Sequence, residues 1–106
     1  MKIINKPRGT GKTVELIHIS EVTGARIITH TLMQAEFIRE KAKELNCTIP
    51  MPMSIQEIKQ GISVAKARPY LIDDIDCWLD YILEDYFGKE VLAVTMSVKE
   101  SGESND

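Results

Sequence analysis

The sequence has few cysteines, and their arrangement is not typical of a metal module. Cys47 and Cys77 are the only two among 106 residues, and they lie thirty positions apart without a CxxC pairing. His18 and His30 show no metal-ligand spacing with either cysteine. Disulfide frameworks and zinc modules usually carry more cysteines at closer spacing. We therefore expect two buried thiols of a reduced cytosolic protein, and a disulfide or a metal site is the weaker alternative.

Long apolar runs and an excess of basic residues are also absent. No run approaches the ~20 residues that span a bilayer, and the apolar segment at residues 2–5 is too short for a signal peptide. The net charge is −3, whereas dedicated nucleic-acid modules usually carry a strong basic excess. With 43% apolar and 27% charged residues, the composition is that of a soluble globular domain. We expect a cytoplasmic protein without membrane contacts.

Short apolar runs alternate with segments of helical periodicity along the chain. The apolar runs predict strands at residues 2–5, 25–30, 69–76 and 90–97, and the helical patterns cover residues 12–22, 32–46, 54–60 and 77–88. Continuous apolar strands are typical of a parallel sheet that is covered on both faces. We predict an α/β fold, a three-layer α/β/α sandwich with a mainly parallel sheet, formed as one domain by residues 1–97. The polar residues 98–106 are expected to be a disordered tail.

Local signals mark several of the predicted helix ends. Thr31 followed by Gln34, and Ser54 followed by Glu57, have the spacing of capping boxes. Gly24 is expected to end the first helix, because glycine readily adopts the left-handed conformation found just after helices.

The aromatic residues lie mainly on the last predicted helix, at Trp78, Tyr81 and Tyr86. Base stacking on single-stranded nucleic acid needs exposed aromatic side chains. Core packing is the favoured role for aromatics on an apolar helix side. Nucleic acid is therefore a weakly supported partner.

The segment KPRGTGKT, residues 6–13, follows the first predicted strand. In a phosphate-binding loop, glycines let backbone N–H groups point at the phosphates, a lysine reaches the terminal phosphates, and the next hydroxyl binds Mg²⁺. The second half of the pattern G-x-x-x-x-G-K-[ST] is present as Gly9, Thr10, Gly11, Lys12 and Thr13. Lys6 stands where the pattern has its first glycine, which governs only the entry turn. We predict nucleotide binding through residues 9–13; the alternative is a glycine-rich turn with a chance GKT.

Carboxylates follow the strand predicted at residues 69–76. Asp73 comes directly after three apolar residues, where a carboxylate can hold Mg²⁺ and its water shell, and Asp74 follows it. Asp76 could compensate for a short Asp74 side chain or could cap the next helix. The alternative is that all three acids are helix-capping residues.

Together these motifs resemble the P-loop NTPases, and within them the additional-strand class of helicases, AAA-type ATPases and viral DNA-packaging motors. PRGTGKT is similar to the variant phosphate loop of large terminases, in which an arginine at the position of Arg8 precedes Gly-x-Gly-Lys. LIDDID resembles the Walker B strand. IITHTLMQAEFI resembles the segment after the second strand of helicase-like ATPases. VLAVTMS resembles the strand whose terminal Thr or Ser senses the γ-phosphate, here Thr95 or Ser97. The resemblance covers about residues 2–97.

The resemblance implies an Mg²⁺-dependent ATPase with ATP and Mg²⁺ as cofactors, for example a viral or phage DNA-processing accessory. The implied catalytic residues are Lys12, Asp74, Arg8 and Thr95, and the implied Mg²⁺ ligands are Thr13 and Asp73. Arg68 could serve a neighbouring copy in an oligomer, although a place on the exposed surface is the favoured role.

Three departures from the family pattern favour an alternative function. Lys6 replaces the first glycine, and Asp74 replaces the usual activating glutamate with a carboxylate one methylene shorter. The sequence also ends where such ATPases continue to further elements, so we expect a minimal core. The alternative is a nucleotide-binding module that does not hydrolyse and acts through a protein partner or a homo-oligomer.

Overall fold

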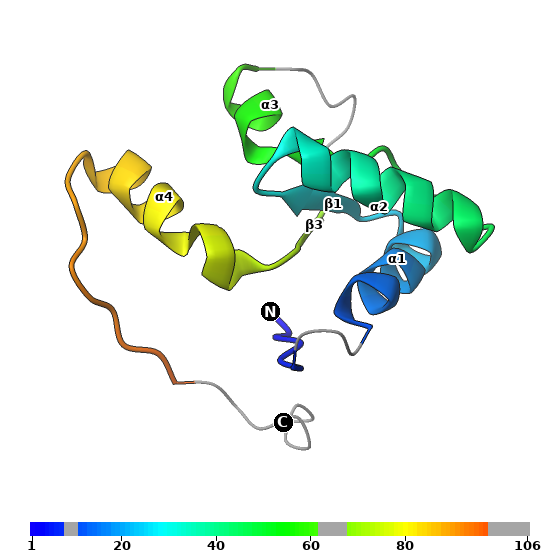
Figure 1. Cartoon of the computed structure of the whole chain (residues 1–106), viewed down its shortest axis with the longest axis horizontal. Helices are drawn as coiled ribbons and strands as arrows, with labels where there is room; N and C mark the ends of the chain where they lie inside the picture. The colour runs from blue at the N-terminus through cyan, green and yellow to red at the C-terminus, as the bar shows by residue number, and fades with distance from the viewer. Residues whose placement is uncertain (8–10, 62–67, 98–106) are drawn as a thin grey trace.

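The computed structural model describes residues 1–7, 11–61 and 68–97. The described residues form a mixed α/β structure with three parallel strands and four helices (Figure 1). In chain order these are α1 (Lys12–Thr23), β1 (Arg26–Thr29), α2 (Leu32–Glu44), β2 (Met53–Ser54), α3 (Ile55–Lys59), β3 (Tyr70–Ile72) and α4 (Ile75–Phe87). The predicted α/β class is confirmed at this level. The tail predicted at residues 98–106 lies outside the described residues.

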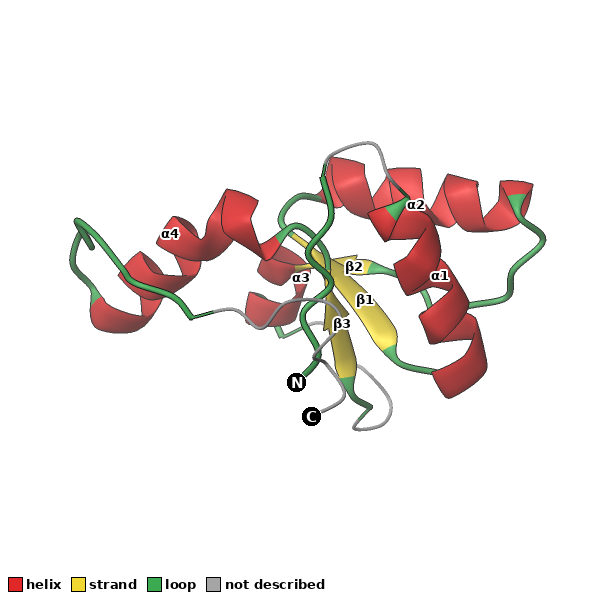
Figure 2. Cartoon of the chain, turned by 90° about the horizontal axis from the view of Figure 1, so that it is seen from below, coloured by secondary structure: helices red, strands yellow, loops and turns green. Residues whose placement is uncertain are grey.

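The strands form one parallel sheet in the order β2-β1-β3, so all three carboxyl ends lie at the same edge (Figure 2). Neighbouring residues of the central strand β1 point to opposite faces of the sheet. Ile27 packs with Ile17 of α1 and Ile38 of α2. Ile28 packs with Met53 of β2 and Trp78 of α4. Helices α1 and α2 therefore cover one face, and α3 and α4 contribute to the cover on the other.

The helix ends confirm most of the predicted local signals. The Thr31 hydroxyl accepts a hydrogen bond from the Gln34 backbone N–H at 3.2 Å. Ser54 and Glu57 form a complete capping box at the start of α3. Gly24 ends α1 with a left-handed φ of 78°, and its N–H donates to the Ser20 carbonyl. These ends depend only on neighbours in the sequence, which is why the sequence predicts them well.

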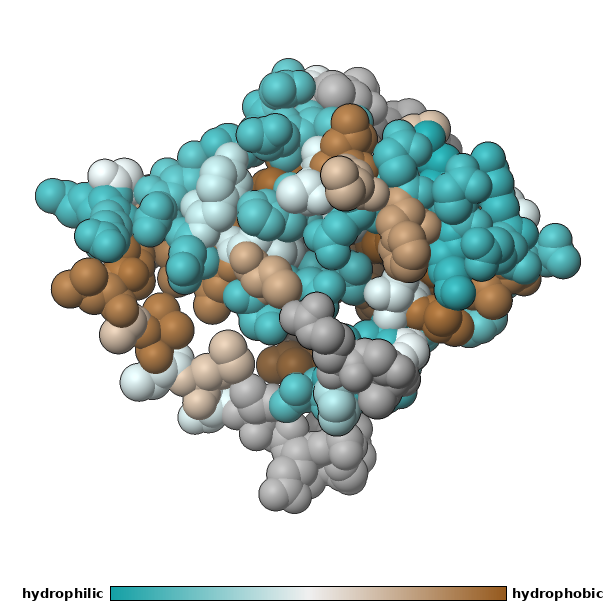
Figure 3. Space-filling view, viewed as in Figure 1, coloured by the Kyte–Doolittle hydropathy of each residue, from teal (hydrophilic) through white to brown (hydrophobic). Residues whose placement is uncertain are grey.

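The strands predicted at residues 2–5 and 90–97 are not formed. Within the described ranges, residues 1–7 and 88–97 contain neither helix nor strand, and Leu92 is 89% exposed. In Figure 1 the segment after α4 turns back at the far end of that helix and stays apart from the sheet, and Figure 3 shows apolar side chains gathered on it. An apolar, β-branched run becomes a strand only where a neighbouring strand supplies hydrogen-bond partners.

The strand predicted at residues 69–76 is confirmed at Tyr70–Ile72, but the prediction that it is buried is wrong. Among the described strands, β3 pairs with β1 alone, so it is an edge strand. Its side chains Tyr70 and Ile72 are 46% and 39% exposed. The acids that follow it nevertheless lie at the carboxyl edge of the sheet, because β3 is parallel to β1.

Helix α4 packs on the sheet only through its first half. Trp78 is buried at 2% exposure, and its indole Nε1 donates to the Asp73 carbonyl at 2.8 Å. The backbone leaves helical geometry at Trp78, with φ −134° and ψ 15°. Beyond Ile82 the helix projects from the sheet, and Tyr86 is 81% exposed (Figure 1). The prediction that the aromatic residues of this helix pack in the core is therefore confirmed for Trp78 and is wrong for Tyr86.

Both cysteines are free thiols, as expected, but neither is buried: Cys47 is half-buried and Cys77 is exposed. Among the described residues, no helix has the length and apolar character needed to cross a bilayer.

Candidate functional site

The glycine that precedes α1 sets the geometry of the helix start. Gly11 has a left-handed φ of 86° and is the N-cap, and its carbonyl accepts the first helical hydrogen bond from Glu15. Most side chains are strained at such a φ. The first backbone N–H groups of α1 have no partners within the helix, so this end carries partial positive charge and suits an anion.

A cavity of about 330 Å³ opens beside this helix start. It is lined by Gly11, Lys12, Thr13, Val14, Phe37, Lys41 and Asp74. The volume lies at the lower end of the range for small-molecule sites, roughly 300–1,000 Å³. A larger hollow of about 520 Å³ runs along the outer face of α1, but its lining includes neither Lys12 nor the aspartates after β3. The smaller cavity is therefore the better candidate for phosphate chemistry.

Lys12 and Asp74 meet across this cavity. The Lys12 Nζ lies 3.7 Å from Asp74 Oδ1, and both side chains are about a quarter exposed. Asp74 is the N-cap of α4, yet its side chain makes no capping hydrogen bond. Its φ of 52° is left-handed, which costs an aspartate about 1 kcal/mol. The structure therefore directs this carboxylate toward Lys12, against the alternative that it caps the helix.

Asp73 is buried directly behind this pair, at 5% exposure. Its backbone N–H donates to the Ile28 carbonyl, which fixes the residue at the end of β3. Burial raises the pKa of its carboxyl group to about 6; Asp74 raises it further, and Lys12 opposes the shift. Burial therefore destabilises the charged form of Asp73, and a cation bound next to it would stabilise that form.

The oxygen donors at this position fit a hard divalent cation. Mg²⁺ prefers carboxylate, hydroxyl, phosphate and water oxygens. Thr13 lines the cavity, and the buried Asp73 carboxylate, which is not in the lining, lies close enough to Lys12 and Asp74 for both to affect its pKa. These two residues would hold the ion.

Lys6 stands where the phosphate-loop pattern has its first glycine, and it contacts α1 from outside the cavity. Its Nζ lies 2.7 Å from Glu15 Oε1, and this hydrogen bond lowers the pKa of Glu15. An ion pair between Lys6 and Glu15 thus joins the segment before the loop to α1. Gly9 and Thr10, which follow in the loop, lie outside the described residues.

The other predicted site residues lie either outside the described residues or away from the cavity lining. Arg8 lies outside the described residues. Thr95 and Ser97 are exposed in the segment after α4, and Thr95 is not among the cavity lining. Arg68 is exposed, and its Nη1 donates to the Gly24 carbonyl at 3.1 Å. The cavity lining therefore brings together Gly11, Lys12, Thr13 and Asp74, with Asp73 buried next to it and without the predicted sensor.

Two residues of α2 line the cavity and were not predicted. Phe37 and Lys41 are four residues apart, so they share one helix side, and Phe37 is 59% exposed. Phe37 is the one aromatic residue of α2 and stands four positions before a lysine, which is the signal that could have identified them.

Comparisons with protein-family models, curated proteins and solved structures found no match for this chain. The candidate site therefore depends on its geometry alone.

Proposed function

We propose that the chain binds ATP with Mg²⁺ in the cavity at the start of α1, in the manner of a minimal P-loop protein. The observation that carries the proposal is the convergence of three groups: the open helix start at Gly11, the Lys12 ammonium and the Asp73–Asp74 carboxylates. An anion and a cation would then be bound side by side, which Mg²⁺–triphosphate requires.

The binding contacts follow from these positions. Backbone N–H groups at the start of α1 and the Lys12 ammonium would bind phosphate oxygens. Thr13 and Asp73 would hold Mg²⁺, which neutralises charge on the phosphates when it is bound. Phe37 and Lys41 on α2 face the same cavity, where an aromatic ring can stack on a base.

Hydrolysis is proposed to be slow. Asp74 is the candidate for orienting water, but its carboxylate lies 3.7 Å from the Lys12 ammonium and would have to be released from that ion pair. Thr95, the residue predicted to sense the γ-phosphate, does not line the cavity. A viral or phage DNA-processing role stays a prediction from the resemblance.

The second candidate is a nucleotide-binding module that does not hydrolyse and acts through a protein partner. The observation that favours it is apolar surface: Leu92, Val94 and Met96 are all more than half exposed after α4 (Figure 3). Larger exposed apolar patches mark interaction surfaces.

A titration of the full chain with ATP and Mg²⁺ tests the proposal. Lys12→Ala is expected to weaken binding by about 10- to 100-fold, because a charge-assisted hydrogen bond contributes about 1.5–3 kcal/mol. Lys43→Ala, an exposed lysine on α2 whose side chain is outside the cavity lining, is the matched control. Equal affinity of Lys12→Ala and wild type would show that the site is wrong. Phosphate release, measured on the same samples, separates the slow enzyme from the binding module.

A further inference from the structure

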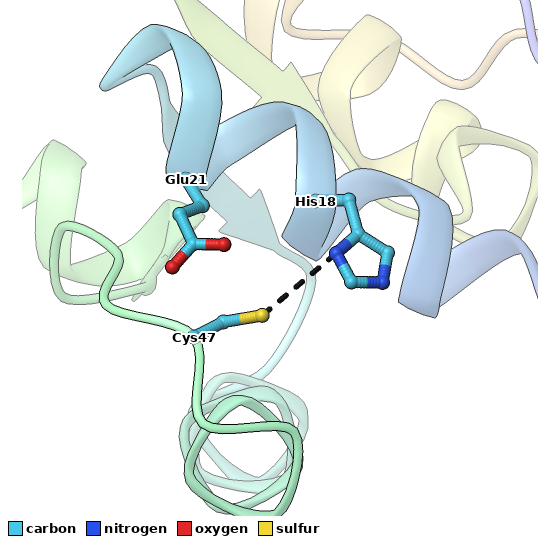
Figure 4. A group of neighbouring side chains, drawn as sticks. All are labelled: His18, Glu21 and Cys47. Atoms are coloured by element: carbon cyan, nitrogen blue, oxygen red, sulfur yellow. Dashed lines mark hydrogen bonds between the residues drawn. The ribbon is translucent and has the colours of Figure 1, made fainter.

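A second group of ligand-type side chains lies on the other end of α1. His18 and Glu21 are three residues apart on this helix, so they share one side, and Cys47 follows the end of α2 (Figure 4). The Cys47 Sγ lies 3.8 Å from the His18 Nδ1. One ligand atom from each of the three residues lies within 4.8 Å of the other two. In Figure 4 the carboxylate and the imidazole both point toward the sulfur.

The backbone around Cys47 holds its thiol in this place. Asn46 adopts a left-handed φ of 57°, and the Cys47 N–H donates to the Ala42 carbonyl at 2.9 Å. The Cys47 side chain is half-buried and packs against the core between α1 and α2. The Glu21 Oε2 accepts a hydrogen bond from the Thr48 N–H at 3.1 Å, which tethers α1 to the segment that carries the cysteine.

The three donors have the chemistry and spacing of a zinc-type site. A tetrahedral zinc ion, with Zn–S and Zn–N bonds of ~2.3 and ~2.0 Å, separates the sulfur and the nitrogen by about 3.5 Å. The observed separation of 3.8 Å needs only a small adjustment. A hydrogen bond between Cys47 and His18 would explain why these two side chains are close, but it would not involve Glu21. A bound cation would use all three groups. Thiolate, imidazole and carboxylate together favour Zn²⁺ over Mg²⁺ or Ca²⁺.

We propose that His18, Glu21 and Cys47 form a binding site for one zinc-type divalent cation. The thiol proton is released to solvent when the sulfur binds the metal. His18 and Glu21 are exposed, so the fourth coordination position is open to water or to a ligand from solution. The site is separate from the nucleotide cavity, whose lining includes none of these residues.

A second candidate group provides the control. Asp74, Asp76 and Cys77 also place ligand atoms within 4.8 Å of one another, at the start of α4. Asp74 is already paired with Lys12 there, and Cys77 is exposed. Each candidate group contains one of the two cysteines, so a signal from metal-bound thiolate reports which group binds.

The experiment titrates the reduced, metal-free full chain with Co²⁺ in the absence of nucleotide. We expect one equivalent to give a thiolate-to-cobalt charge-transfer band and the visible bands of tetrahedral cobalt, and we expect Zn²⁺ to remove both. Cys47→Ser should abolish the charge-transfer band, and Cys77→Ser should leave it unchanged. His18→Asn, at an exposed position that tolerates substitution, should weaken binding at least about tenfold, since even outer-shell partners contribute that much.

Three spectroscopic results would each overturn the proposal: no charge-transfer band in the wild type, a band that survives Cys47→Ser, or a band lost in Cys77→Ser. Wild-type cobalt affinity in His18→Asn would also overturn it, because the histidine would then not be a ligand. Circular dichroism of each variant confirms that lost binding is not lost folding.

Discussion

Replacing the buried Asp73 carboxylate with the uncharged amide of asparagine is expected to stabilise the empty protein at neutral pH. Asp73 is 5% exposed, and burial is the main reason that its pKa rises from 3.8 to about 6. The folded protein therefore holds a proton on this group that the unfolded chain has already released. Asp73→Asn resembles the protonated form at every pH, so it removes the penalty of burying the charge.

The size of the effect follows from the pKa difference. A shift of about two pH units corresponds to about 3 kcal/mol between the protonation states. Because the folded-state pKa is raised, this stability is fully present below pH 3.8, is lost as pH rises through about 6, and stays lost above it. At pH 7 we expect Asp73→Asn to be about 1–3 kcal/mol more stable than wild type, the lower figure allowing for hydration of the amide. The melting temperature should rise by about 5–15 °C.

Urea unfolding of wild type and Asp73→Asn between pH 4 and pH 7 measures this directly. The stability difference between them should grow across that range, and Asp80→Asn, an exposed carboxylate on α4, should show little difference at any pH. Adding Mg²⁺ and ATP should stabilise the wild type more than the variant, because Asp73 would hold the ion. A stability difference that does not change with pH would refute the reasoning.

The remaining predictions concern the fold and are measured by urea unfolding. Ile17→Val should cost about 0.5–1.5 kcal/mol, because Ile17 is fully buried in the core between α1, α2 and β1. Ser54→Ala should cost about 0.5–2 kcal/mol by removing the α3 capping box, and Ser54→Thr should retain most of it. Gly24→Ala should cost about 1–2 kcal/mol, because the residue has φ 78° and a Cβ would lie 2.8 Å from the Arg68 Nη1. If adding Arg68→Ala restored the whole loss of stability caused by Gly24→Ala, the positive φ of this residue would contribute nothing to that loss.

Features that depend on neighbouring residues are predictable from this sequence. The spacing of Ser54 and Glu57 predicts the start of α3, and Gly24 predicts the end of α1. The apolar run at residues 25–30 predicts β1, since a central parallel strand is buried on both faces. The two-residue strand β2 was not predicted, because the prolines at positions 50 and 52 favour an extended chain without showing that it pairs in a sheet.

Features that depend on pairing between distant segments are not predictable in the same way. The runs at residues 2–5 and 90–97 have the composition of strands, but a strand also needs a partner. His18 and Cys47 approach each other only because α1 packs on α2, and no spacing rule covers residues 29 positions apart. For the same reason Phe37 and Lys41 were missed, although the glycine, lysine and aspartates of the candidate site were identified from local motifs.

The outer edge of β3 has a consequence for how the protein behaves in concentrated solution. Among the described strands only β1 pairs with β3, so backbone donors and acceptors on its other side must be hydrated or must pair with a strand from elsewhere. The strand spans three residues, so an added ribbon could form few hydrogen bonds, and self-association through this border should be weak and reversible. A strand that paired there in parallel would end beside Asp73, the residue proposed to hold Mg²⁺.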